Sequence, residues 1–115
     1  MIISFKKQKD RLSIFLAEKG HWTPTTFFPQ LDSAVEKIRF ELEKSSQENV
    51  VFDLSSLKSM DSSIISLVIQ TIRLARNNKV CVLATHEDVF NMLMLLGIDE
   101  LAHVYSSESV MNEEI

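Results

Sequence analysis

The chain has 115 residues, of which 45% are hydrophobic and 24% are charged, and its formal net charge is −4. This length suits one folded domain, here residues 1–115, and this composition excludes a wholly disordered chain. The acidic balance argues against nonspecific nucleic-acid binding, which needs a clustered basic surface, and no apolar run approaches the roughly 20 residues of a membrane-spanning helix. Because the amino terminus lacks the charged start and apolar stretch of a secretory signal, we expect a cytoplasmic protein.

The first part of the chain has the pattern of a β-hairpin. Two apolar runs, Ile2–Phe5 and Leu12–Ala17, flank a polar stretch. That stretch holds the only basic cluster, which we interpret as a solvated turn beside Asp10. The cluster consists of Lys6, Lys7 and Lys9.

A helix is predicted after this hairpin. Thr25 and Thr26 are candidate N-caps, and Pro29 suits the first turn. Apolar residues then repeat at helical spacing at Leu31, Ala34, Val35, Ile38 and Leu42. Phe40 lies nearly opposite that face, and we favour a peripheral contact with another segment over a partner-facing anchor.

The middle of the chain alternates between strand and helix patterns. Val50–Leu54 and Val80–Leu83 are short apolar runs typical of buried strands. Cys81 lies within the second run and is interpreted as a core thiol. Between these runs, residues 63–77 are predicted to form a largely apolar helix. Its one polar stripe is Ser66, Gln70, Arg73 and Asn77.

The last part predicts one more helix and one more strand. Thr85 is the expected N-cap of that helix, with Asp88 at the capping-box position, and Gly97 is its expected C-terminal stop. His103–Tyr105 is predicted as a short strand, and residues 106–115 as a polar tail or final helix. The resulting fold class is α/β, a mixed sheet of four to five strands with three to four helices.

The segment from Asp53 to Ile65 carries the most specific signal. It reads Asp53-Leu54-Ser55 at the end of a strand and Met60-Asp61-Ser62-Ser63 at the start of a helix. In this placement the segment resembles the STAS domain family, of the anti-sigma factor antagonist type. The resemblance implies that Asp61 and Ser62 carry the signature and that Ser62 is phosphorylated. Gly97-Ile98 is a second, weaker point of similarity.

The residues themselves give a separate reason for choosing Ser62. A serine at a helix start lies beside free backbone N–H groups and the positive end of the helix dipole, where a phosphate can be accommodated. Four residues before Ser66 lies Ser62, at the head of the polar stripe, whereas Ser63 leads to apolar Leu67. The alternative is that Asp61 or Ser62 only caps the helix. With the resemblance, we favour a regulatory site.

Two departures from the family pattern bear on partner binding. The family has glycine and leucine after the two serines, where this chain has Ile64 and Ile65. Glycine permits close approach of a partner backbone, so its loss is expected to alter partner geometry or phosphorylation efficiency. The aspartate that relatives carry after the second strand is absent from Gly20–Thr23. In that segment Trp22 is equally an interface anchor or a plug for one end of the core. The expected partner-binding residues are Asp61, Ser62, Ser63, Ser66 and Trp22.

No catalytic, metal or cofactor site is predicted. The chain lacks a phosphate-binding glycine loop, a dinucleotide fingerprint, a nucleophile elbow and a His-Glu-x-x-His zinc motif. The histidines, His21, His86 and His103, and the single cysteine show no metal-ligand spacing. We therefore do not expect an enzyme.

The resemblance implies a partner-switching protein. Unphosphorylated, it binds a serine kinase that doubles as an anti-sigma factor and has a histidine-kinase-like ATPase fold; phosphorylated on Ser62, it releases that partner. A PP2C-type phosphatase restores it, and neither nucleic acid nor direct membrane insertion is involved. One alternative is a STAS subunit of a membrane transport complex, such as a lipid-transport ATPase. Another is a switch whose output is an enzyme or a biofilm regulator.

Overall fold

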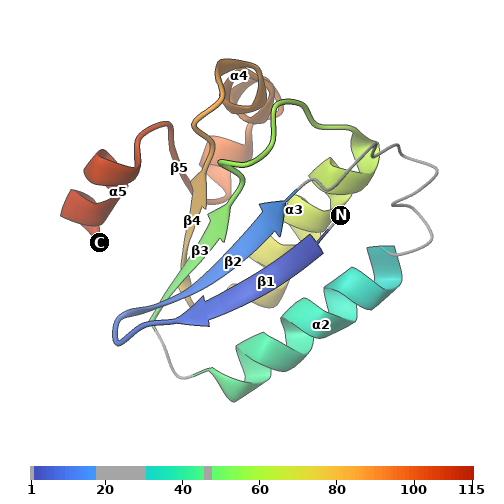
Figure 1. The fold of residues 1–115 in the computed structure, drawn as a ribbon, viewed down its shortest axis with the longest axis vertical. Coiled ribbons are helices and arrows are strands. Elements are labelled where there is room, and N and C mark those ends of the chain that lie inside the picture. Colours follow the sequence, from blue (N-terminus) through green and yellow to red (C-terminus); the bar gives the residue numbers. More distant parts are fainter. Residues whose placement is uncertain (1, 18–30, 46–47) are drawn as a thin grey trace.

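The structure is a computed structural model that describes residues 2–17, 31–45 and 48–115. These residues form a five-stranded sheet with the strand order β1-β2-β3-β4-β5 (Figure 1). The first two strands, β1 (Ile2–Lys7) and β2 (Arg11–Ala17), pair antiparallel as a hairpin. The next three each pair parallel to the strand before, and they are β3 (Asn49–Asp53), β4 (Lys79–Leu83) and β5 (His103–Tyr105).

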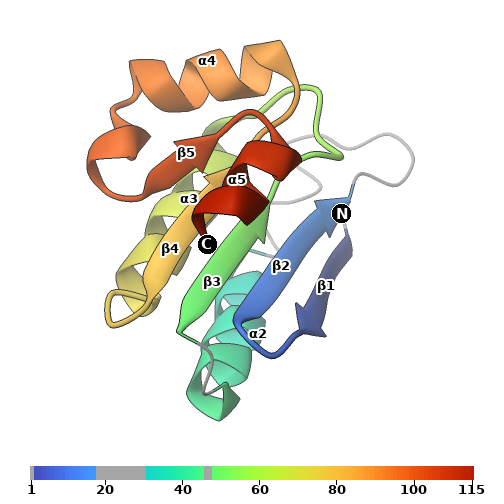
Figure 2. The same ribbon diagram turned by 90° about the vertical axis from the view of Figure 1, so that its left-hand side faces the viewer.

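The helices lie on both faces of the sheet and across one end of it. Helices α2 (Leu31–Lys44) and α3 (Ser62–Leu74) lie side by side on one face, and α5 (Glu108–Glu114) covers the other (Figure 2). Helix α4 (Glu87–Leu95) crosses the end at which the parallel strands finish, and the short 3-10 helix η2 (Ile98–Glu100) follows it. The loop from β3 to α3 lies at this same end.

Burial explains why the central strands are apolar without alternation. Val50 and Phe52 of β3 belong to the main core beneath α2 and α3. Val51, between them, packs in a second cluster with Cys81, Leu83 and Met111 of α5. Because both faces of the sheet are covered, consecutive residues of β3 and β4 are all buried.

Most predicted elements are confirmed, including the hairpin, the two buried strands, the strand His103–Tyr105 and the stop at Gly97. Gly97 has φ +74°, in the left-handed region that glycine adopts without strain. Of the two expectations for residues 106–115, the final helix is the one found, with Ser107 as its N-cap. Thr25, Thr26 and Pro29 lie outside the described residues.

The predicted cap of α4 is wrong. His86 is the N-cap, and its Nδ1 accepts a hydrogen bond from the backbone N of Asp88 at 3.2 Å. The hydroxyl of Thr85 instead donates to the carbonyl of Ser55 at 3.5 Å. Thr85 therefore makes a tertiary contact with the loop after β3, and it does not cap α4.

Phe40 of α2 is a large apolar side chain at the surface. Phe40 is 59% exposed, and the ammonium of Lys44 lies 4.6 Å from the centre of its ring. Most of that ring faces solvent, and the partner identified for it is on its own helix.

In the described part of the chain, no helix is long and apolar enough to cross a membrane.

Candidate functional site

The loop after β3 is fixed at both ends and exposed in the middle. Leu54 and Leu57 are fully buried, and the N–H of Leu54 donates to the carbonyl of Leu83 at 2.8 Å. The carboxylate of Asp53 accepts from the backbone N of Ser55 at 2.9 Å and also from its hydroxyl. Ser56 and Ser59 are exposed between these anchors. The loop therefore delivers the start of α3 to the surface in a defined position.

Asp61 starts helix α3. Its backbone is extended, with φ −120° and ψ −174°, and its Oδ1 accepts from the backbone N of Ser63 at 2.9 Å and of Ile64 at 3.2 Å. The same oxygen accepts the hydroxyl of Ser63 at 2.8 Å. The second oxygen, Oδ2, is buried and has no hydrogen-bond partner among the described residues. The capping role that sequence left open between Asp61 and Ser62 therefore belongs to Asp61.

Ser62 and Ser63 have opposite environments although they are adjacent. Ser62 is exposed at the first position of α3, and within the described residues its hydroxyl makes no hydrogen bond. Ser63 is 0% exposed and its hydroxyl is bound to Asp61. The exposure predicted for Ser62 from the polar stripe is thus found. Ser63, also predicted to contact a partner, has no surface with which to do so, because its side chain points into the helix start.

Two of the expected free N–H groups at this helix start, those of Ser63 and Ile64, are already occupied. Besides the two bonds to the Asp61 carboxylate, the N–H of Ile65 donates to the Asp61 carbonyl at 3.0 Å. A phosphate on Ser62 would therefore compete with Asp61 for these donors. Asp61 thus satisfies two of the donors expected to be free for a phosphate, and accommodation of a phosphate at this helix start stays a prediction.

The rest of the polar stripe runs along α3 away from Ser62. Ser66 is half-buried, and its hydroxyl accepts a hydrogen bond from Gln70 Nε2 at 2.9 Å, one turn further on. Arg73 continues the stripe and is exposed. Ser62 and Ser66 therefore share one accessible helix face, as the spacing predicts.

Ile64, which stands where the family has glycine, is 0% exposed and belongs to the main core. Its side chain points away from the surface that carries Ser62. The substitution therefore fills the interior, and its effect on partner geometry stays a prediction.

The sequence also singles out tryptophan, histidine and cysteine side chains. Trp22 and His21 lie outside the described residues. Across residues 2–17, 31–45 and 48–115, no group of three or more His, Cys, Asp or Glu side chains could hold a metal ion. Cys81 is fully buried, as predicted, and this burial raises the pKa of its thiol.

Comparison with known proteins gives the same assignment for the family and for the fold. The family model of the STAS domain matches residues 25–111. No curated protein sequence matches the chain. Among solved structures, an anti-sigma factor antagonist from Mycobacterium paratuberculosis is similar, with a TM-score of 0.75 and 15% identity over 99% of this chain and 92% of that one.

Three further structures have the same fold. A variant of RsbS from Moorella thermoacetica has a TM-score of 0.72 and 15% identity over 93% of this chain and 88% of that one. The Bacillus cell fate determinant SpoIIAA in its phosphorylated form has a TM-score of 0.64 and 14% identity over 99% of this chain and 100% of that one. The unphosphorylated form of SpoIIAA has a TM-score of 0.68 and 16% identity over 97% of this chain and 95% of that one.

Proposed function

Because the chain belongs to the STAS domain family, we propose that it is a protein-binding switch of the anti-sigma factor antagonist type, controlled by phosphorylation of Ser62. The observation that carries this proposal is the contrast between Ser62, exposed at the head of α3, and Ser63, fully buried beside it. A kinase needs an accessible hydroxyl, and of this pair only Ser62 has one. The similarity to SpoIIAA, solved in phosphorylated and unphosphorylated forms, supports the same type of control.

The proposed partner in the unphosphorylated state is a serine kinase that also acts as an anti-sigma factor. It docks on the face formed by the β3–α3 loop and the start of α3, where Asp61, Ser62 and Ser66 are presented. A PP2C-type phosphatase reverses the modification. The chain itself performs no catalysis in this scheme and works in the cytoplasm.

Release follows from charge at the interface. Phosphorylation adds about −1.5 to −2 charges at neutral pH. In the docked complex this charge meets the partner surface packed against Ser62, where we propose that the partner places a carboxylate or a tightly packed backbone. A unit like-charge contact near 4 Å costs about 4 kcal/mol at an intermediate effective dielectric. Since about 1.4 kcal/mol is tenfold in affinity, half of that repulsion weakens binding more than tenfold.

The fold itself tolerates the phosphate, because Ser62 is exposed and makes no hydrogen bond that the modification would break within the described residues. The helix dipole stabilises the added negative charge by roughly 0.3 to 1 kcal/mol, whereas the carboxylate of Asp61 repels it. Partner release is therefore local and does not require refolding.

Copurification tests this function. The wild-type chain and Ser62→Ala should retain a kinase, and Ser62→Asp should lose it. Ser4→Asp is the matched control, because Ser4 is an exposed serine of β1, outside the proposed docking face, and it should retain the partner. Retention of a transporter ATPase by all four proteins would contradict the switch and support the docking subunit of a lipid-transport complex instead.

A further inference from the structure

A groove lies at the opposite end of α3 from Ser62. It encloses about 680 Å³ and is lined by the last turn of α3, the start of β4 and the segment from η2 into β5. Ile72 and Val80 form its apolar floor, and Leu101, 57% exposed, forms part of its wall. Ser62 is ten positions before Ile72, which is about 15 Å along a helix axis. The groove is therefore separate from the proposed switch site.

An apolar ridge precedes the groove wall in the chain. Leu95, at the end of α4, is 83% exposed, and Leu96, which follows it, is 47% exposed. Gly97 and η2 connect these leucines directly to the groove wall at residues 99–103. Exposed leucines grouped in this way mark an interaction surface more than isolated ones do. The molecule thus offers a protruding apolar element and, a few residues further along the chain, a groove with an apolar floor.

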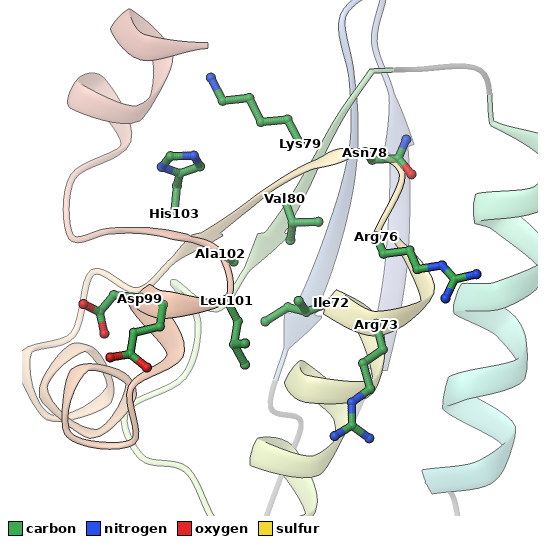
Figure 3. Close-up of a pocket in the computed structure, with 11 residues that line it drawn as sticks. Ile72, Arg73, Arg76, Asn78, Lys79, Val80, Asp99, Leu101, Ala102 and His103 are labelled. Carbon is green, nitrogen blue, oxygen red and sulfur yellow. The ribbon is translucent and has the colours of Figure 1, made fainter.

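The two sides of the groove carry opposite charges. Arg73 and Arg76 lie on the α3 side, and Asp99 lies on the η2 side, with Ile72 and Val80 between them (Figure 3). Glu100 adds to the acidic side, and Lys79 and His103 lie at one end of the groove. None of Arg73, Arg76, Asp99 and Glu100 forms an ion pair within the described part of the chain. Both flanks are therefore available to a partner.

We propose that this surface binds a second copy of the chain in a two-fold symmetric dimer. In such a dimer the same patch on both subunits must be complementary to itself. Here the ridge at Leu95 and Leu96 of one subunit enters the groove of the other, and the reverse contact forms at the same time. The basic flank of each subunit then faces the acidic flank of its partner.

The charge arrangement favours a second copy over a foreign protein. A foreign partner would be expected to meet a patch of one predominant sign, whereas this patch has two arginines facing two carboxylates. The groove lies at the opposite end of α3 from Ser62, and the proposed dimer does not depend on the proposed switch.

Sedimentation velocity over a concentration series tests the proposal. The wild-type chain should dimerise, and Leu95→Asp should weaken dimerisation at least tenfold by placing a charge in the partner's apolar groove. The basic-flank variant, Arg73→Glu with Arg76→Glu, and the acidic-flank variant, Asp99→Arg with Glu100→Arg, should each weaken it as well, because like charges then face each other.

Mixing the two flank variants is the decisive step. One variant has two acidic flanks and the other has two basic flanks, so every flank contact in a mixed dimer pairs opposite charges. An equimolar mixture should therefore form dimers where neither variant does alone. As a control for net charge, Lys6→Glu with Lys9→Glu changes the net charge of the β1–β2 hairpin as the basic-flank variant changes that of the groove, and it should leave wild-type dimerisation in place. Circular dichroism confirms that each variant is folded. A wild-type chain that stays monomeric up to about 1 mM overturns the proposal, as does a mixture of flank variants that stays monomeric.

Discussion

At the scale of single residues, three adjacent side chains have three different roles, and their sequence alone does not distinguish these roles. The three are Asp61, Ser62 and Ser63. Asp61 caps the helix, Ser63 closes a buried hydrogen bond to it, and Ser62 remains at the surface. The polar stripe predicted which serine is exposed, because helical spacing fixes the face of each residue. It could not predict that Asp61 takes the N–H donors, since the side-chain geometry of a cap is not visible in spacing.

Ser63→Ala separates modification from helix capping. The variant loses the hydrogen bond from the Ser63 hydroxyl to Asp61 and should be less stable by about 1 kcal/mol, while the cognate kinase still adds one phosphate. Phosphopeptide mapping should place that phosphate on Ser62 in both wild type and variant. A phosphate found on Ser63, Ser59 or a serine of the C-terminal segment would contradict the assignment.

Tyr105 gives the fold a pH dependence at alkaline pH. Its hydrogen bond with Glu114, followed by burial, raises the pKa of the phenol from 10.0 to about 12. Because the folded-state pKa lies above the unfolded one, the stabilisation is fully present below about pH 10 and is lost as the pH rises toward 12. Urea unfolding between these limits should show a smaller loss of stability in Tyr105→Phe than in wild type. Parallel losses in the two proteins would exclude this hydrogen bond as the cause.

At the scale of elements, helix α3 connects the interior with the proposed switch site. Its periodicity predicted both the buried and the polar face, and the structure confirms them up to Leu74, where α3 ends before Asn77. The effect of Ile64 on the partner stays a prediction, and its helical phase puts the side chain in the core. Ile64 lies three residues before Leu67, and both are fully buried. The cap of α4 could not be predicted either, since Thr85 and His86 are adjacent candidates and only the contact of Thr85 with Ser55 separates them.

Ile64→Ala should therefore act on stability and leave the switch surface intact. Truncating a fully buried isoleucine costs about 2–5 kcal/mol through lost burial and the cavity that remains. Ile65→Ala, at a half-buried position of the same turn, should cost less. Chemical denaturation measures both, and partner affinity should be unchanged under conditions where each variant is folded. A specific loss of affinity in folded Ile64→Ala would restore the role in partner geometry.

Helix α5 shields Cys81, with which Met111 shares a buried cluster. Burial keeps the thiol protonated and out of reach, so wild type should react with a thiol reagent only through opening of the structure. Met111→Ala loosens the packing of α5 and should speed the reaction. Val110→Ala, at a neighbouring exposed position, is the control and should not. Fast reaction of native wild type would show that α5 does not protect this face.

At the scale of the whole molecule, the sheet places two surfaces at opposite ends of α3. The start of α3 carries Ser62, and its last turn lines the groove with Arg73 and Arg76. The order of strands and helices was predictable from apolar runs. The groove was not, because it joins residues 72–80 to residues 99–103, and only the pairing of β4 with β5 brings these segments together. The placement of Trp22 stays a prediction.

The central claim is that a phosphate on Ser62 releases the partner without unfolding the domain. Calorimetric titration of the copurified kinase with unphosphorylated and with fully phosphorylated protein measures this directly, with thermal unfolding recorded for both forms. We predict that phosphorylation weakens binding more than tenfold while both forms unfold cooperatively at similar temperatures. Equal affinity of the two forms, or a loss of binding that accompanies collapse of the phosphorylated domain, would contradict the account.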